Sequence, residues 1–390
     1  YISCGIYTMI HSIKNTYSIS MNNIFFSYLC SMDKNEFHSF RLPAEWEQQD
    51  SIMLIWPHED TDWRPYLEEI TEVYLQMADA ITRHEELLIT ARDIESVRLL
   101  LAERLSEEQI RRVTLFACDN NDTWARDVAP ITILSEGKPE GYFHPRHLLD
   151  FCFNGWGKKF AAEKDNRINR QVYKAGLFHG TLENHKDFVL EGGSIESDGD
   201  QTLFTTTSCL MAPYRNQPLT KEEIDEKLRS LFPNVERVIW LDHGQLAGDD
   251  TDGHIDTIVR IAPNDTLLYI GCDDKEDEHY EDFRLLEEQL KLLRTTKGKP
   301  YRLLRLPMPD AIYDEEERLP ATHANFLIIN GAVIVPIYNQ PEKDKVALET
   351  IQTAFPDREI VGIDSRTIIR QHGSIHCLTM QFPSLSPKER

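Results

Sequence analysis

One stretch decides the predicted fold: Asn325-Phe326-Leu327-Ile328-Ile329-Asn330-Gly331-Ala332-Val333-Ile334-Val335-Pro336-Ile337. Two short apolar segments flank Asn330-Gly331, the dipeptide that most strongly favours a two-residue β-hairpin. A polar residue, Asn325, precedes the first strand. Downstream, the patterns predict a helix over Val346–Phe355 and a single strand over Glu359–Ile363. The stretch therefore predicts a unit of hairpin, helix and strand that opens on a polar residue.

Three more hairpins of this kind precede it in the chain. They are predicted at 129–137, 194–206 and 255–270, and the polar residues that open them are Asp127, Glu191 and His254. Cys377 opens a fifth strand, whose partner we expect to be the first strand, Ser51–Trp56. The sequence thus predicts five units closed into a ring, with one polar residue of each at the central axis. An ordinary open α/β sheet is the alternative.

The remaining periodic segments supply the other helices and strands. Apolar residues at helical spacing predict a helix from Leu67 to Ile81, and Thr220 with Glu223 forms a capping box ahead of a second helix. Further helices are expected at 94–105 and 283–293, and further strands at 86–90, 113–117, 237–241 and 301–306.

Composition indicates a globular protein outside the membrane. Of the 390 residues, 41% are hydrophobic and 27% charged, and no apolar run approaches the length of a membrane span. The formal net charge of -23 argues against a nucleic-acid partner, which requires a basic face, and is compatible with a small cationic substrate.

Residues 1–31 differ from the rest of the chain, because Lys14 is their one charged residue. We interpret them as a non-native or disordered leader, with Met32 as a start of the native chain, and we expect one catalytic domain over 42–385. The apolar core at Ile24-Phe25-Phe26 is short for a secretory signal and lacks a basic residue just before it.

The seven cysteines indicate a reduced, cytoplasmic protein. No C-x-x-C pair occurs, so neither a disulfide framework nor a structural zinc site is expected. The run from Asp249 to Asp256 is acidic enough to suggest a metal site. Calcium loops need a distal glutamate at a fixed offset and zinc needs a second histidine nearby, and the run has neither. We therefore expect no metal.

The polar residues at the strand starts could act together in catalysis. A thiol, an imidazole and several carboxylates are the set needed for nucleophilic chemistry on a cation. Each also has an ordinary interpretation: Asp127 in a loop salt bridge, Glu191 in a solvated turn, His254 as a packed histidine, and Cys377 as a small core residue.

Five ordered motifs resemble those of the agmatine deiminases, which belong with the bacterial type of peptidylarginine deiminase in the guanidine-modifying superfamily. They are Trp124-Ala125-Arg126-Asp127, Asn154-Gly155-Trp156-Gly157-Lys158, Glu191-Gly192-Gly193, Asp252-Gly253-His254-Ile255-Asp256 and Gly373-Ser374-Ile375-His376-Cys377. The resemblance extends from about Leu42 to Phe382. It implies a five-bladed pseudo-symmetric α/β propeller, of the pentein type. His372-Gly373-Ser374 replaces the family's glycine-rich run, so this loop could be narrower or reshaped.

The resemblance also implies a reaction: hydrolysis of agmatine to N-carbamoylputrescine and ammonia, a step of putrescine and polyamine biosynthesis. Cys377 would be the nucleophile that forms a covalent thiouronium, His254 the general acid and base, and Glu191 the residue that orients His254. Asp127 and Asp256 would grip the guanidinium through paired, charge-assisted hydrogen bonds.

Other side chains would bind the substrate. Asp250 is a third candidate for the cation, and Asn325 for a polar contact. Trp63 and Trp156 could be plain core residues, but both lie in polar stretches, which favours a role in lining a pocket around an alkyl-guanidine chain.

The same chemistry on peptidyl-arginine or another guanidine is the first alternative, and a non-catalytic binding protein on the same fold is the second. We expect no cofactor, no nucleic acid and no membrane partner. The oligomeric state is open, with a homo-oligomer as one alternative.

Overall fold

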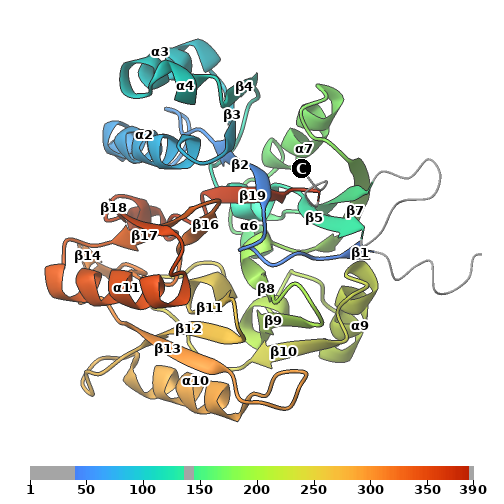
Figure 1. Ribbon diagram of the computed structural model, residues 1–390, viewed down its shortest axis with the longest axis vertical. Coiled ribbons are helices and arrows are strands. Elements are labelled where there is room, and N and C mark those ends of the chain that lie inside the picture. The colour runs from blue at the N-terminus through green and yellow to red at the C-terminus, as the bar shows by residue number, and fades with distance from the viewer. Residues whose placement is uncertain (1–39, 136–144, 386–390) are drawn as a thin grey trace, which may run out of the picture.

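A computed structural model describes residues 40–135 and 145–385. Within them the chain has an α/β fold in which small sheets lie around the middle of the molecule, with most of the longer helices outside them (Figure 1). The expected leader at 1–31 and the first hairpin's turn at 136–137 lie outside the described residues.

The hairpin with Asn330-Gly331 forms as expected. Strand β16 (Leu327–Ile329) pairs antiparallel with β17 (Ala332–Ile337), and β17 pairs in parallel with β18 (Glu359–Asp364). Gly331 adopts φ +76°, the left-handed conformation that the turn requires. Helix α11 (Pro341–Ala354) connects β17 to β18 and begins earlier than predicted, because Pro341 suits a first helical position.

The same pattern of one antiparallel and one parallel pair recurs in two further three-stranded sheets. One contains β8 (Ile195–Ser197), β9 (Thr202–Thr206) and β10 (Arg237–Leu241), and the other β11 (Val259–Ala262), β12 (Thr266–Gly271) and β13 (Arg302–Pro307). The strands predicted at 237–241 and 301–306 are thereby confirmed, the second with a shift of one residue.

The other two larger sheets have four strands each. One contains β1 (Phe40–Arg41), β5 (Ile131–Ser135), β6 (Arg146–Cys152) and β7 (Thr181–Val189), and the other β19 (Thr379–Pro383), β2 (Gln49–Ile55), β3 (Glu86–Ala91) and β4 (Val113–Ala117). Strands β19 and β2 pair antiparallel, with Thr379 opposite Leu54. The predicted pairing of the strand after Cys377 with the first strand is confirmed.

The strands that follow the polar residues start later than the sequence suggested. Residues 129–130, 194 and 255–258 were expected in strands and lie outside them. Single helical turns occupy or border these places: α5 (Ala125–Val128), η3 (Gly192–Ser194) and η4 (Ile255–Thr257). Backbone bonds such as that from the Ile258 amide to the Ile255 carbonyl close these turns. The polar side chains therefore project from tight turns at the strand mouths.

Helices pack their apolar faces on the sheets and form the outer layer (Figure 1). The longer ones are α2 (Leu67–Thr82), α3 (Ile94–Arg104), α7 (Asp165–Lys174), α9 (Lys221–Leu231) and α10 (Tyr280–Leu292). The short elements are η2 (Arg64–Tyr66), α4 (Glu107–Ile110), α6 (Gly155–Lys158), α8 (Thr207–Leu210), β14 (Tyr313–Asp314), β15 (Glu317–Arg318) and η5 (Ile368–Gln371).

The capping box ahead of α9 is present and supports one stability prediction. Thr220 Oγ1 accepts from the Glu223 amide at 3.2 Å, and Glu223 Oε2 accepts from the Thr220 amide at 2.8 Å. Replacing Thr220 by Ala should lower the free energy of unfolding by about 0.5–2 kcal/mol, because the Glu223 amide loses its capping partner. Urea unfolding measures this, with Thr220→Ser as the control that should stay close to the native stability.

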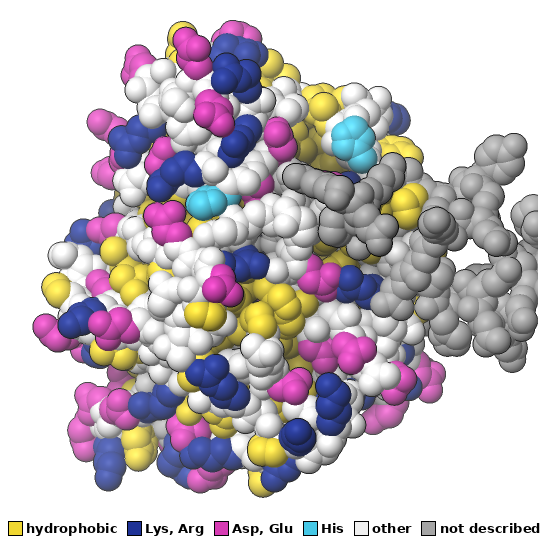
Figure 2. Space-filling model, in the orientation of Figure 1, with side chains coloured by type: hydrophobic (Ala, Val, Ile, Leu, Met, Phe, Trp, Pro, Cys, Tyr) yellow, Lys and Arg dark blue, Asp and Glu magenta, His cyan; other side chains and the backbone are white. Residues whose placement is uncertain are grey.

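The five larger sheets share no strand among the described residues, so they form no closed sheet, and the propeller ring stays a prediction. No helix in ranges 40–135 and 145–385 is long and apolar enough to cross a membrane. Acidic and basic side chains are interspersed on the face shown in Figure 2, without a broad basic area.

Candidate active site

The turns before the strands bring the predicted catalytic residues together. Asp127 lies in α5, Asp256 in η4, and Cys377 two residues before β19. The Arg126 amide donates to the Cys377 carbonyl at 3.1 Å, which fixes α5 against the turn that carries the thiol. Residues from distant parts of the chain thus meet at one place.

The thiol of Cys377 faces an amide and a carboxylate. Its Sγ lies 3.4 Å from Asn325 Oδ1 and 3.8 Å from Asp256 Oδ2, and the residue is 4% exposed. Burial, together with the negative charges of Asp256 and Asp127, raises the pKa of Cys377 well above 9. The thiol is therefore neutral at physiological pH unless a cation offsets these charges.

Asn325 positions the backbone of the turn that carries Cys377. Its Oδ1 accepts from the amides of His376 at 3.0 Å and Cys377 at 3.3 Å, while its Nδ2 donates to the Asp256 carbonyl at 3.4 Å. One side chain thereby ties the thiol to the turn of Asp256.

Asp127 is anchored on both carboxylate oxygens. Oδ1 accepts from the Gly193 amide at 3.1 Å, and Oδ2 accepts from Trp156 Nε1 at 3.0 Å. Burial raises the pKa of Asp127, as do the nearby charges of Asp256 and Glu191, although His254 opposes them. Three carboxylates thus face one buried region, where a cation would be favoured.

Gly193 lies where these groups converge. A Cβ on Gly193 would stand 2.6 Å from His254 Nδ1, 3.0 Å from Asp256 Oδ2 and 3.2 Å from Asp127 Oδ1. Any larger residue would clash with His254 and crowd the two carboxylates, so the glycine at this position permits the convergence.

His254 is fully buried and favours its charged form. Burial alone would lower the pKa of His254, but the interactions with Asp127, Cys209 and Glu191 outweigh it and raise that pKa well above 6.5. Its Nδ1 is 3.8 Å from Asp127 Oδ1. Glu191, also fully buried, accepts through Oε1 from Arg215 Nε at 2.8 Å.

Several buried polar atoms around this point have no hydrogen-bond partner within the described part of the chain. They are both ring nitrogens of His254, Oε2 of Glu191, Oδ1 of Asp256 and Oγ of Ser374. An unpaired buried polar atom costs about 1–3 kcal/mol, so such a concentration is typical of a ligand site.

A network of charged side chains next to Asp256 was not predicted from the sequence. His376 Nδ1 lies 2.7 Å from Asp256 Oδ2, and His376 Nε2 lies 2.7 Å from Glu45 Oε1. Glu45 also binds Arg126 at 2.8 Å and Arg260. Burial would raise the pKa of Glu45, but His376 and the two arginines hold it well below its usual range. The only signal in the sequence was that His376 immediately precedes Cys377.

The predicted binding residues lie at different depths. Trp156 is buried and donates to Asp127, whereas Trp63 is fully buried, donates to Thr123 at 2.8 Å, and packs behind Trp124 with ring centroids 5.7 Å apart. Asp250 is only partly exposed. Its partial burial, together with the negative charge of Asp249, raises the pKa of Asp250 to about 6. The structure thus brings Trp156, but not Trp63, into contact with the carboxylates.

The loop that departs from the glycine-rich run is tethered to the Asp250 segment. His372 adopts φ +64°, a conformation that favours glycine, and its Nδ1 lies 2.8 Å from the Gly248 carbonyl. Gly373 packs so closely on Trp124 that a Cβ would lie 2.2 Å from that ring.

Comparison with known proteins places the chain in a family. The family model of Porphyromonas-type peptidyl-arginine deiminase matches residues 41–383. The chain belongs to this family. A relative in Mycoplasma capricolum subsp. capricolum, named as a proposed agmatine deiminase, is 32% identical, and the match covers 88% of this chain and 96% of that protein. The expected family is confirmed.

Solved structures of the Porphyromonas-type family and its relatives share the fold. A proposed arginine deiminase from Porphyromonas gingivalis is 47% identical with a TM-score of 0.81, covering 88% of this chain and 98% of that one. A substrate-bound cysteine-to-serine variant of the C. jejuni agmatine deiminase is 37% identical with a TM-score of 0.79, covering 88% and 96%. The agmatine deiminase of Enterococcus faecalis is 29% identical with a TM-score of 0.78, covering 89% and 96%.

Proposed function

We propose that this protein hydrolyses agmatine to N-carbamoylputrescine and ammonia. The observation that carries the proposal is the buried thiol of Cys377, which lies 3.8 Å from Asp256 in a region that Asp127 and Glu191 also face. Such a region favours a planar cation next to a nucleophile. Relatives named agmatine deiminase, including one with substrate bound, support the choice of agmatine.

In the proposed complex, Asp127 and Asp256 bind the guanidinium. Carboxylates pair with a guanidinium through two parallel, charge-assisted N–H···O bonds. Asp127 is held for this task by Gly193 and Trp156, while Oδ1 of Asp256 has no hydrogen-bond partner among residues 40–135 and 145–385. The grip places the guanidinium carbon beside the Cys377 sulfur and offsets the charges that raise the pKa of the thiol.

The bond-making steps then need one proton shuttle. The Cys377 thiolate attacks the guanidinium carbon to give a tetrahedral adduct, and ammonia leaves as His254 donates a proton to its nitrogen. The covalent thiouronium that remains is attacked by water, whose proton passes to His254. The C–S bond then breaks, releasing the thiolate and the ureido product, and the second water proton passes to the released ammonia. Glu191 orients His254 and favours its charged form.

The remaining predicted residues would support binding. Asn325 holds the turn of Cys377, and Trp156 lines the pocket beside Asp127. Asp250 would interact with the cationic substrate from the partly exposed side, with Trp63 supporting the pocket through Trp124. His376 acts as a positioning residue because it contacts the Oδ2 atom of Asp256, and Glu45 acts through it by holding the other ring nitrogen of His376.

The main alternative is the same chemistry on arginine. The family description and the Porphyromonas gingivalis relative's name both refer to arginine substrates. The decisive experiment is a panel of agmatine, free arginine and an arginine-containing peptide, assayed for ammonia and the ureido product. Agmatine should give the highest kcat/KM, because the α-carboxylate of arginine would meet an acidic region. Equal rates on agmatine and arginine would contradict the proposal, and no turnover of any guanidine would favour a binding protein.

The state of the thiol leads to a prediction on pH. Because the pKa of Cys377 lies well above 9, the thiolate fraction should rise about tenfold per pH unit between pH 7 and 9. Inactivation by neutral iodoacetamide should follow this rise. A cationic haloacetamidine should react far faster at pH 7, since its charge stabilises the thiolate. Peptide mapping should find Cys377 modified; a pH-independent rate, or labelling of Cys152 or Cys209 instead, would contradict the prediction.

Two structural proposals, on the propeller and on the domain, accompany the proposed function. We propose that the five larger sheets are the blades of a pseudo-symmetric propeller and that residues 42–385 form one catalytic domain. A cytoplasmic location, the absence of a nucleic-acid partner and independence from any cofactor stay predictions. A homo-oligomer stays one alternative for the assembly.

A further inference from the structure

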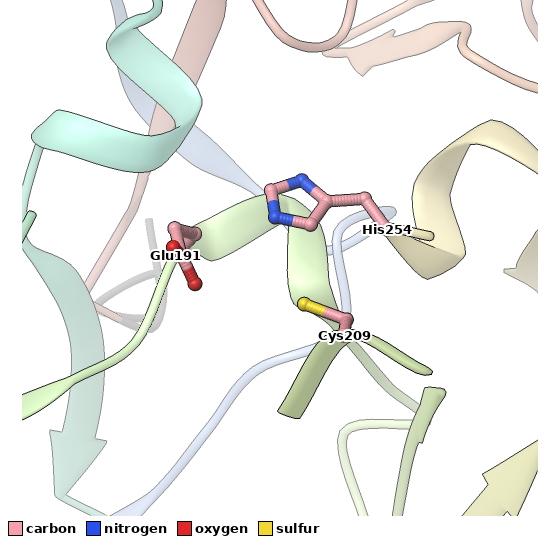
Figure 3. Close-up of side chains that lie close together, drawn as sticks. All are labelled: Glu191, Cys209 and His254. Carbon is pink, nitrogen blue, oxygen red and sulfur yellow. The ribbon is translucent and has the colours of Figure 1, made fainter. Parts of the chain in front are cut away.

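A second cluster of buried side chains includes His254. It consists of Glu191, Cys209 and His254, whose ligand-type atoms all lie within 4.8 Å of one another. Cys209 comes from α8, while Glu191 and His254 immediately precede η3 and η4. Figure 3 shows the carboxylate and the sulfur on the same side of the imidazole ring. The proposed reaction uses Glu191 and His254 but leaves Cys209 without a role.

Two of the three residues offer unpaired atoms to this space. Both nitrogens of His254 and Oε2 of Glu191 have no hydrogen-bond partner among the described residues, and all three side chains are fully buried. A thiolate, an imidazole and a carboxylate are ligands that Zn²⁺ binds with three protein groups and one open position. We propose that Glu191, Cys209 and His254 form a zinc site whose occupation reversibly inhibits the enzyme.

The surrounding charge favours a cation. Asp127 lies 3.8 Å from His254, and the charge of Arg215 is already offset by Glu191 and by Asp252, which is 2.6 Å from Nη1. Binding must displace the Cys209 proton and any second proton on the imidazole. Zinc affinity should therefore increase with pH.

A second group of potential metal ligands has similar spacing, but the charge around it does not favour a cation. Glu45, Glu196 and His376 also lie within ligand distance of one another, but Arg260 donates to both carboxylates. A guanidinium thus already supplies the positive charge between them, and, in contrast to Oε2 of Glu191 and the ring nitrogens of His254, each of their ligand atoms has a hydrogen-bond partner. The contrast restricts the proposal to the cluster around Cys209.

Zinc bound at this site would inhibit the proposed reaction because it would occupy two side chains that the reaction needs. A zinc ion on His254 occupies the lone pair that must accept and release protons, and a zinc ion on Glu191 removes the group that orients the ring. Only this consequence depends on the proposed deiminase function; metal binding itself does not.

Cobalt is the spectroscopic probe that locates the site. The Cys377→Ser variant, freed of metal with a chelator, should bind one equivalent of Co²⁺ and show the thiolate-to-cobalt absorption band. Adding Cys209→Ala should abolish that band, whereas Cys118→Ala, which removes another buried thiol, should leave it unchanged. Zinc should compete with cobalt in the same titration.

Activity assays with zinc and a chelator provide the second test of the site. The metal-free native enzyme should be active, micromolar zinc should inhibit it, and a chelator should restore it. Cys209→Ala should keep catalysis within a few-fold and weaken zinc inhibition by roughly 100-fold or more, since even loss of an outer-shell partner costs 10–100-fold in affinity. The proposal is overturned if Cys377→Ser binds no cobalt, if the band persists without Cys209, or if Cys209→Ala is inhibited like the native enzyme. An enzyme that binds cobalt through Cys209 but turns over no guanidine would refute the proposed function alone.

Discussion

A Cys377→Ser variant should fold normally and lose turnover by on the order of 10⁴-fold or more, since removing the nucleophile of a covalent mechanism costs up to about 10⁶ in kcat. The physical reason is that a serine hydroxyl is almost wholly protonated at neutral pH, and His254 is in its charged form and cannot act as its base. The hydroxyl can still donate to Asn325 Oδ1, which lies 3.4 Å from the sulfur. Steady-state assays with agmatine measure the loss.

Two measurements separate loss of chemistry from loss of structure. The variant should bind agmatine with an affinity close to the native KM and keep the native unfolding midpoint. Cys272→Ser, which removes another buried thiol, is the matched control and should keep its rate. A Cys377→Ser enzyme that retains a substantial rate would show that another group is the nucleophile.

The second large effect is expected on substrate affinity. Asp127→Ala or Asp256→Ala should each lower kcat/KM for agmatine by roughly two to four decades, because a buried charge pair broken from one side costs about 3–5 kcal/mol. Asp127→Ala also leaves Gly193 and Trp156 without an acceptor, and Asp256→Ala leaves Nδ1 of His376 without its partner.

A cleaner form of this experiment uses the inactive background. Binding of agmatine to Cys377→Ser with and without Asp127→Ala measures the grip on the cation without any contribution from chemistry. Asp150→Asn is the matched control, since Asp150 is buried and pairs with Lys186 and Asn169 elsewhere in the fold. Its stability should fall while agmatine affinity holds. Unchanged affinity in Asp127→Ala would place the guanidinium elsewhere.

The hairpins were predictable because their turn chemistry and strand pattern are local. Asn330-Gly331 specifies a two-residue turn by itself, and the single strand after each helix follows from parallel pairing within the same unit. Strand β7, Thr181–Val189, was not predicted, because charged and polar residues fill most of it and only its end is buried. Its partner β6 determines it, and that information is not local.

The site was predictable in part for a similar reason. Asp127, Asp256 and Cys377 could be proposed because each comes at a recognisable place before a strand. Arg215 and Glu45 lie in irregular segments, so only the three-dimensional contacts with Glu191 and His376 reveal them. The helical turns before the strands were missed because the apolar residues that follow, such as Ile255, equally favour an extended chain.

Because β2 pairs with β19, the candidate active site is not fully assembled until the chain has been synthesised as far as β19. Thr379 must reach Leu54, a partner synthesised long before it, and Cys377 takes its place between Asn325 and Asp256 next to that contact. A nascent chain that stops before Cys377 contains the carboxylates and the imidazole but not the thiol. Under the proposed mechanism such a chain cannot hydrolyse a guanidine, so completion of the fold and onset of catalysis would coincide.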